Sequence, residues 1–377
     1  MGKKAIVAGH MCMDITPEFL NAPISRFDQI FGPGLVVDVG EAIFKPGGCV
    51  SNTGLAMNFF GADVTLMGRI NEDNLGSMLL DEYKKSGAKL GIKIDHDHPS
   101  GYTIVLSPRG LDRMFLHNPG TNSYTNNDDF DKEIIKEADL FHFGYPTLMP
   151  QYLKDDCREL VELFKMVKEA KTVSSMDLTM PNHDSDIKNM DWEGIFRKVL
   201  PFVDVFLPSF EEIQYILDPD KYFNLYKKAD GGDMASLIDI EKDIKPLAEK
   251  LIEYGSAIVL IKCGPRGMYL RTADKNRLFD LKEILNLDLE KWADISIKQD
   301  SFVADRVLAA TGAGDTSIGG FLYSLMRAED PKRALEYAAG AGASCVTAYD
   351  SISGLISFDQ MREKIDKGWQ TNKWEAI

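Results

Sequence analysis

The chain has 377 residues, of which 44% are hydrophobic and 27% are charged, a composition typical of globular proteins. This length accommodates one large α/β domain or two smaller ones. The formal net charge of −15 argues against nucleic acid or an anionic membrane surface as a main partner, so an anionic ligand would need a local binding site.

The cysteine pattern and the hydropathy point to a cytoplasmic protein. The five cysteines have no CxxC spacing, and we expect them to be reduced, buried thiols. No apolar run reaches the roughly 20 residues that a membrane span needs, and the first residues lack the apolar core of a signal peptide.

Apolar patterns alternate between strands and helices over the first part of the chain. Residues 4–10 and 63–70 favour strands, and residues 51–62 and 74–88 favour helices that each end near a glycine. This βαβα order predicts a mostly parallel sheet covered by helices.

Two segments interrupt this order. Residues 34–45 are strand-like with no helix after them, and residues 101–118 favour two strands around a turn at SPRG. The alternation of Tyr102, Ile104 and Leu106 indicates an antiparallel hairpin with one solvent-exposed face. We expect these segments to form a small separate sheet.

The strand and helix order then resumes. The expected strands are 138–146, 172–178, 203–209, 256–264 and 267–272, and the expected helices are 152–170, 210–217 and 333–350. The last helix is rich in Ala and Gly, which would allow close packing on a neighbour. Residues 221–234 are polar and predict a loop, and residues 278–302 are irregular and indicate an insertion.

The sequence TGAGD precedes a further helix, whose apolar residues Ile318, Phe321, Leu322 and Leu325 have helical spacing. Glycines at 312 and 314 let a ligand approach the backbone, and the unpaired first-turn N–H groups with the helix dipole form an anion site. Asp315 could accept a proton from a hydroxyl nucleophile there, or it could simply cap the helix. The motif alone leaves both interpretations open.

Other nucleotide-binding motifs fit less well. A GxGxxG dinucleotide loop would need glycine where Ser317 stands. The GxxxxGK[ST] phosphate-binding loop and the HRD and DFG motifs of protein kinases are absent from the sequence.

Six segments in order, from about residue 4 to 366, resemble the signatures of the ribokinase-like (PfkB) family of sugar and nucleoside kinases. They are GHMCMDI with Asp14, the stretch 47–88 with Gly47, Gly48 and Asn52, GLDRMFLHNPGTN with Arg113, LPSFEEI with Ser209 and Glu212, IKCGPRG with Lys262, Gly264 and Gly267, and TGAGD with Thr311 and Asp315. The order of these pieces carries the resemblance, since each piece alone is weak.

The resemblance implies a single three-layer α/β/α domain over residues 1–377, with a mostly parallel central sheet and a small β-sheet lid formed by about 15–45 and 99–120. It implies an ATP-dependent kinase that transfers the γ-phosphate to a hydroxyl of a small sugar or sugar derivative. In this family the lids of two subunits often pair, so we expect a homodimer.

The resemblance also implies residue roles. The acceptor would be held by Asp14, Gly47, Gly48, Asn52 and Arg113, and the nucleotide by Ser209, Lys262, Gly264, Gly267 and Thr311. Asp315 would be the base, beside the backbone of Gly312, Ala313 and Gly314, and Glu212 would bind Mg²⁺ through water.

The chain departs from the family pattern in two places. Ala309 and Ala310 replace an Asp-Thr pair whose acid often helps to bind a monovalent cation, which puts activation by K⁺ in doubt. Ser209 replaces an asparagine and has a shorter reach. A nucleoside kinase of the same family and a non-catalytic sugar-binding protein remain alternatives.

Overall fold

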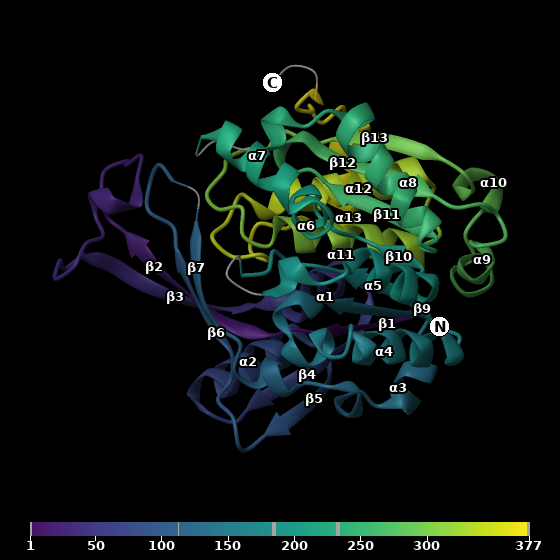
Figure 1. The fold of residues 1–377 in the computed structure, drawn as a ribbon, viewed down its shortest axis with the longest axis horizontal. Helices are drawn as coiled ribbons and strands as arrows, with labels where there is room; N and C mark the ends of the chain where they lie inside the picture. The colour runs from purple at the N-terminus through teal and green to yellow at the C-terminus, as the bar shows by residue number, and fades with distance from the viewer. Residues whose placement is uncertain (1, 112, 183–185, 231–233, 375–377) are drawn as a thin grey trace.

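The computed structural model describes residues 2–111, 113–182, 186–230 and 234–374, and these residues form two sheets. The larger sheet has nine strands in the order β13-β12-β11-β10-β9-β8-β1-β4-β5 (Figure 1). Neighbouring strands pair in parallel, except that β12 is antiparallel to β11 and β13. The strands are β1 (Lys4–Gly9), β4 (Asp63–Asn71), β5 (Lys89–Asp95), β8 (Leu140–Gly144), β9 (Val173–Asp177), β10 (Val205–Phe206), β11 (Ile258–Lys262), β12 (Gly267–Thr272) and β13 (Ser296–Asp300).

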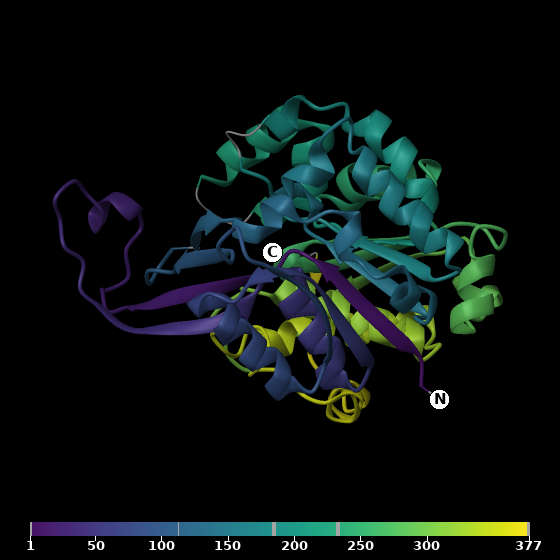
Figure 2. The ribbon, with the colours of Figure 1, turned by 90° about the horizontal axis from the view of Figure 1, so that it is seen from below.

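Helices cover both faces of this sheet (Figure 2). One layer consists of α1 (Gly48–Phe60), α2 (Asn74–Ser86), α11 (Ala313–Met326), α12 (Pro331–Cys345) and α13 (Phe358–Asp366). The other consists of α3 (Lys132–Lys136), α4 (Arg158–Glu169), α5 (Trp192–Val199), α6 (Phe210–Leu217) and α8 (Lys245–Glu253). Successive strand side chains point to opposite faces, so Ala5 and Val7 enter one core and Ile6 and Ala8 the other. The predicted three-layer α/β/α fold is confirmed.

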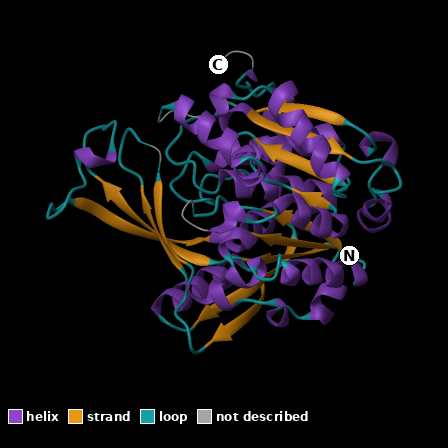
Figure 3. Cartoon of the chain, in the orientation of Figure 1, coloured by secondary structure: helices purple, strands orange, loops and turns teal. Residues whose placement is uncertain are grey.

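A four-stranded sheet projects from the body of the molecule, and we call it the arm sheet (Figures 1 and 3). Its order is β3-β2-β6-β7, with β2 (Cys12–Phe19), β3 (Val39–Gly47), β6 (Tyr102–Leu106) and β7 (Met114–Asn118). The predicted separate sheet and its β6–β7 hairpin are confirmed, whereas strand β2 was not predicted. Only His10 and Met11 separate β1 from β2, and α1 follows β3 without a gap.

The arm sheet has an apolar face and a polar face. Residues directly opposite one another on neighbouring strands share a face. One such row is Phe44, Ile15, Ile104 and Leu116, and the row one residue along, on the other face, is Lys45, Asp14, Thr103 and His117. The polar face is the one that contacts the body, because His117 reaches His10 at the end of β1.

Two expectations are wrong. Residues 221–234 were expected to form a loop, but α7 spans Pro219–Ala229, and residues 231–233 lie outside the described part of the chain. The Asp218 side chain caps α7 by accepting from the backbone N–H of Lys221, and Pro219 begins the helix, so local start signals prevail over the polar composition.

The segment 278–302 is regular rather than an irregular insertion. It forms α9 (Phe279–Leu285), α10 (Leu289–Trp292) and β13, which adds an antiparallel edge strand beside β12. The Trp292 side chain is fully buried in the core, which anchors this segment to the body.

Within the described residues, no helix combines the length and apolarity needed to cross a bilayer.

Candidate active site

Polar side chains gather at the carboxyl ends of the central strands. Tyr145 directly follows β8, Asp177 ends β9 and Lys262 ends β11. The N-terminus of α11 lies among them, since Asp315 contacts Tyr145 and the Lys262 side chain passes Gly314. In open α/β sheets, ligands bind outside this edge.

Asp315 is buried in the first turn of α11 and is held by two side chains. The amide Nδ2 of Asn52 donates to its Oδ2 over 2.8 Å, and the Tyr145 hydroxyl lies 2.7 Å from both carboxylate oxygens. Gly312, with φ +77°, is the N-cap residue, so the Asp315 carboxylate points to side chains instead of capping the helix. Burial raises the pKa of Asp315, and the charge of Lys262 and the two hydrogen bonds oppose that rise.

Close helix packing brings Asn52 and Asp315 together across the chain. A Cβ at Gly319 would lie 3.1 Å from Cβ of Ala56, and a Cβ at Gly320 would lie 3.1 Å from Cβ of Ala341. The small residues therefore let α11 pack tightly between α1 and α12, as the Ala- and Gly-rich pattern predicted for the last helix. Asn52 is well inside α1, whose N-cap is Gly47, so Asn52 is not a cap residue.

The orientation of the Asn52 amide is fixed from its far side. The Ser351 hydroxyl donates to Asn52 Oδ1 over 2.8 Å, which leaves the NH₂ group to face the Asp315 carboxylate. Gly312 makes room for this contact, because a Cβ there would overlap Cβ of Ser351. Ser351 thus orients a donor toward Asp315, and it was not predicted.

Asp14 lies on the polar face of the arm sheet, and a Cβ at Gly47 would overlap its carboxylate. The thiol of Cys12 donates to Asp14 Oδ1 over 3.4 Å. Burial raises the pKa of Asp14 to about 7, and the negative charge of Asp315 adds to that rise. The structure therefore brings Asp14, Gly47, Asn52 and Asp315 together.

A histidine pair joins the arm sheet to the body. The two Nε2 atoms of His10 and His117 lie 3.3 Å apart, and His117 Nδ1 lies 3.0 Å from the Thr103 hydroxyl. Burial lowers the pKa of both histidines, so both imidazoles stay neutral at pH 7. Neutral rings can share one proton between the two Nε2 atoms, which two charged rings could not.

Lys262 forms a partly buried ion pair with Asp177 at the other end of the site. Its Nζ lies 2.8 Å from Asp177 Oδ1, and its carbon chain lies 3.7 Å from where a Cβ of Gly314 would be. Burial alone would lower the pKa of Lys262, but the charges of Asp177 and Glu212 hold it above its usual value. The ammonium group therefore remains charged beside the first turn of α11.

Ser209 and Glu212 begin α6 with a capping box. The Ser209 N–H donates to Glu212 Oε2 over 2.7 Å, and the Glu212 N–H donates to the Ser209 hydroxyl. Ser209 and Lys262 also form an isolated parallel β-bridge, which puts the start of α6 next to β11. Burial raises the pKa of Glu212, whose charge interacts with Lys262 and Asp315.

The carboxylates suit a magnesium ion held jointly with phosphates. Asp177 Oδ2 is buried and has no hydrogen-bond partner among the described residues, and Glu212 supplies a second hard oxygen ligand nearby. Mg²⁺ is usually bound by one or two carboxylates together with water and substrate phosphates. No three metal-ligating side chains gather in the described residues, so an ion held by protein groups alone is not indicated.

Gly264, Gly267, Thr311 and Ala313 are the remaining residues predicted to lie near the nucleotide. Gly264 (φ +55°) and Gly267 (φ +111°) form the turn between β11 and β12, and their contact with a nucleotide stays a prediction. The carbonyl of Thr311 accepts from the Cys345 thiol, and the N–H of Ala313 donates to the Ala310 carbonyl over 3.3 Å.

Arg113 lies near Asp315. Its charge lowers the pKa of Asp315, so its guanidinium is close enough to act on that carboxylate. The same guanidinium lies 5.6 Å from the centre of the Phe115 ring. A position at the acceptor end of the site is compatible with both observations.

The structure adds four residues that the sequence did not reveal: Tyr145, Asp177, Ser351 and His117. Asp177 could have been found, because an acid that ends an apolar strand lies at the ligand-binding edge of such a sheet. The other three have no local pattern, because their partners come from distant parts of the chain.

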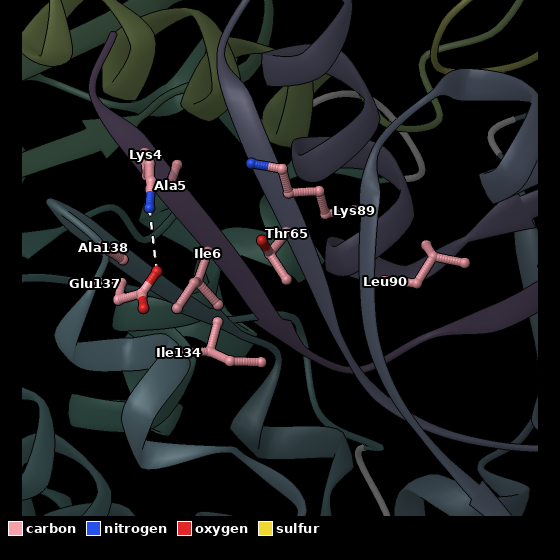
Figure 4. Close-up of a pocket in the computed structure, with 9 residues that line it drawn as sticks. All are labelled: Lys4, Ala5, Ile6, Thr65, Lys89, Leu90, Ile134, Glu137 and Ala138. Carbon is pink, nitrogen blue, oxygen red and sulfur yellow. Dashed lines mark hydrogen bonds and ion pairs between the residues drawn. The ribbon is translucent and has the colours of Figure 1, made fainter. Parts of the chain in front are cut away.

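A surface pocket of about 200 Å³ lies elsewhere, among Lys4, Thr65, Lys89 and Ile134 (Figure 4). Lys4 Nζ is paired there with Glu137 over 3.1 Å. This pocket adjoins the amino ends of β1, β4 and β5, the edge opposite Asp315, where open α/β sheets do not bind their ligands.

The chain is similar to several known kinases. The chain is 23% identical over 301 residues to an uncharacterized sugar kinase of Archaeoglobus fulgidus, covering 80% of this chain and 98% of that protein. It is 24% identical to probable fructokinase-5 of Arabidopsis thaliana, covering 82% and 85%. The structure of Arabidopsis thaliana ribokinase complexed with ribose and ATP superposes with a TM-score of 0.68 at 18% identity, covering 96% and 98%.

The model of the pfkB family carbohydrate kinases matches residues 7–357, nearly the whole chain. The chain therefore belongs to the pfkB carbohydrate kinase family and is an ATP-dependent phosphotransferase with an alcohol group as acceptor.

Proposed function

We propose that the chain transfers the γ-phosphate of ATP to a hydroxyl of a small sugar or sugar derivative, with Asp315 as the general base. The observation that carries the proposal is the buried Asp315 carboxylate in the first turn of α11, beside Lys262 on one side and Asn52 on the other. A carboxylate there can take a proton from a hydroxyl, while the helix N-terminus attracts a phosphate.

The acceptor is held between the arm sheet and α1 in this proposal. The Asp14 carboxylate accepts hydrogen bonds from the acceptor's hydroxyls, and the Asn52 amide donates to them. The Gly47-Gly48 backbone lets the acceptor approach closely. Arg113 adds a positive charge at the same end of the site. Holding a hydroxyl in line with the γ-phosphate supplies much of the rate enhancement in phosphoryl transfer.

The nucleotide phosphates lie at the start of α11 in this proposal. The Gly314 N–H group and the Lys262 ammonium stabilise negative charge on the transferring group. Asp177 and Glu212 would hold Mg²⁺ with the phosphates, and the ion would neutralise their charge. Ser209, Gly264, Gly267 and Thr311 surround the nucleotide, and Ala309 in place of an acid puts activation by K⁺ in doubt.

The decisive test replaces the proposed base. Asp315→Asn should lower kcat by about 10²–10⁴-fold while leaving ATP affinity within a few-fold, as measured by calorimetry. Asp305→Asn is a matched control, because Asp305 is an exposed carboxylate paired with Lys364. An Asp315→Asn enzyme with near-normal turnover would remove the base assignment.

The acceptor class is tested by ADP release. Wild-type protein with ATP and Mg²⁺ is screened against sugars, sugar acids, sugar phosphates and nucleosides, with and without K⁺. Turnover with a sugar supports the proposal, and turnover with nucleosides alone favours the nucleoside kinase. Binding of a sugar without ADP release with any acceptor would support the non-catalytic alternative.

We also propose that the arm sheet is a lid and a dimer interface. Its apolar face presents Phe44 and Leu116, which are 42% and 49% exposed, in one row with Ile15 and Ile104. A contiguous apolar face of this kind usually marks an interface. Leu116→Glu should convert the dimer to a monomer in sedimentation experiments, and a monomeric wild-type protein would refute this proposal.

The expected setting is the cytoplasm. All five cysteines are buried free thiols, as predicted, which suits a reducing compartment.

A further inference from the structure

Tyr145 has a contact with Asp315 that the mechanism above does not use. Its phenol lies 2.7 Å from both carboxylate oxygens, and Asn52 Nδ2 lies 2.8 Å from Oδ2. A single hydroxyl thus covers both oxygens of the proposed base. The phenol and the Asn52 amide together engage both carboxylate oxygens, which leaves few lone pairs for a molecule that gives its proton to Asp315.

The position of this phenol is set by the backbone. Tyr145 has φ +66°, a left-handed conformation that is uncommon for residues other than glycine. Its N–H donates to the Asp177 carbonyl over 3.4 Å, and its carbonyl accepts from the Leu148 N–H over 2.9 Å. The ring is partly buried against the core, with the His10 ring 5.9 Å away between centroids. The phenol is therefore placed on Asp315 by the end of β8.

The chemical state of the phenol fits a donor. Burial raises the pKa of Tyr145 well above its usual value, and the negative charge of Asp315 raises it further. The hydroxyl keeps its proton and donates it to the carboxylate.

We propose that Tyr145 shields Asp315 from water and yields only to a bound acceptor hydroxyl, so that ATP is not hydrolysed unproductively. This inference rests on the proposed function of Asp315. In productive transfer, the acceptor oxygen bonds to the γ-phosphorus, the bond from that phosphorus to the bridging oxygen breaks, ADP leaves and the acceptor proton passes to Asp315. Water would follow the same steps and give ADP and inorganic phosphate.

The acceptor can displace the phenol where water cannot, because of how each is held. A hydrogen bond to a charged group changes an equilibrium by roughly tenfold or more, and a free water molecule has nothing to offset that cost. A sugar anchored by Asp14 presents its hydroxyl at a high effective concentration. The Tyr145 phenol therefore discriminates between a polyol and water, because Asp14 holds the polyol at its far end.

The test is the ratio of acceptor-independent to acceptor-dependent ADP release at saturating ATP and Mg²⁺. Tyr145→Phe should raise this ratio roughly tenfold, because it removes the phenol oxygen and leaves the ring. The hydrogen bond from Tyr145 lowers the pKa of Asp315, so its removal should raise that pKa and shift the acidic limb of kcat to higher pH. Adding Asp315→Asn should abolish the extra hydrolysis, which shows that it proceeds through that carboxylate.

The matched control is Tyr152→Phe. Tyr152 is buried and its hydroxyl donates to Asn127 Oδ1 over 3.2 Å, a contact that does not involve Asp315. This variant should keep the wild-type ratio. Tyr145→Met fills the site without a donor and should also uncouple the enzyme, which keeps the test open if Tyr145→Phe folds poorly.

The two proposals fail in different ways. If the wild-type protein phosphorylates no acceptor, the proposed function is wrong. If the wild-type protein is a coupled kinase and both Tyr145 variants keep its ratio within twofold, only the shielding role is wrong. An equal fall in both activities also leaves the ratio unchanged and overturns the shielding role.

Discussion

The raised pKa of Asp14 predicts that acceptor binding depends on pH. Burial holds the pKa of this carboxyl at about 7, so it is neutral at lower pH and ionised at higher pH. An ionised carboxylate forms hydrogen bonds about twice as strong as those of a neutral acceptor. Acceptor affinity should therefore rise as pH rises through 7.

The size of the effect follows from the titration. With a pKa of about 7, about a tenth of Asp14 is ionised at pH 6 and about nine tenths at pH 8. If only the ionised form binds the acceptor, its KM falls by about tenfold between these pH values. The assay is the acceptor KM at saturating ATP in steps across this range.

Asp14→Asn separates this group from other titrations. Asparagine keeps the shape but does not ionise, so KM should be high and flat across the range. Asp63→Asn, which changes an exposed carboxylate paired with Lys89, should keep the wild-type slope. A wild-type KM that is independent of pH, or an Asp14→Asn enzyme that keeps the slope, would refute the reasoning.

The same shift affects stability. Between pH 4 and 7 the folded protein holds a proton on Asp14 that the unfolded chain releases, so the free energy of unfolding falls as pH rises through this window. A shift of about three units corresponds to at most about 4 kcal/mol. Denaturant titrations of Asp14→Asn should show a smaller fall over this window than those of the wild type.

Three further variants test the surroundings of Asp315. Ser351→Ala removes the hydrogen bond that orients Asn52 and should lower kcat several-fold, with a loss of about 1 kcal/mol of stability by denaturant titration; an unchanged kcat would exclude the orienting role. Gly312→Ala should cost more stability than Gly368→Ala, because both have positive φ but only the first would overlap another side chain; equal costs would contradict this. Lys262→Met should raise the ATP KM at least tenfold in steady-state kinetics, and an unchanged KM would remove the lysine from the phosphate site.

The central sheet could be predicted because its strands and helices carry strong local signals. The apolar run ending at Gly9 and the helix that stops at Gly61 follow simple rules, and both lie where expected. Strand β2 was missed although the apolar Met13 and Ile15 alternate with the polar Asp14 and Thr16 on opposite faces of the arm sheet. The helix α7 was missed because its charged residues outweighed the Asp218-Pro219 start signal.

The candidate site was predicted only where a motif marks it. Asp14, Asn52 and Asp315 belong to recognisable segments, so their meeting could be expected. Tyr145 contacts Asp315 across 170 residues of sequence, and Ser351 contacts Asn52 across 299 residues. Contacts between residues so far apart in the sequence depend on the tertiary fold, and no local pattern names the two partners.

The short joints between the arm sheet and the body have a mechanical consequence. Strand β2 continues from β1 after two residues, and β3 runs straight into α1, so the arm cannot tilt without moving Asp14 relative to Asn52. The joint at Gly47-Gly48 is also where the acceptor is proposed to lie. The separation of the two carboxylates, Asp14 and Asp315, is therefore set by the tilt of the arm. If the acceptor lies at this joint, as proposed, an acceptor of a different length would require a different tilt of the arm.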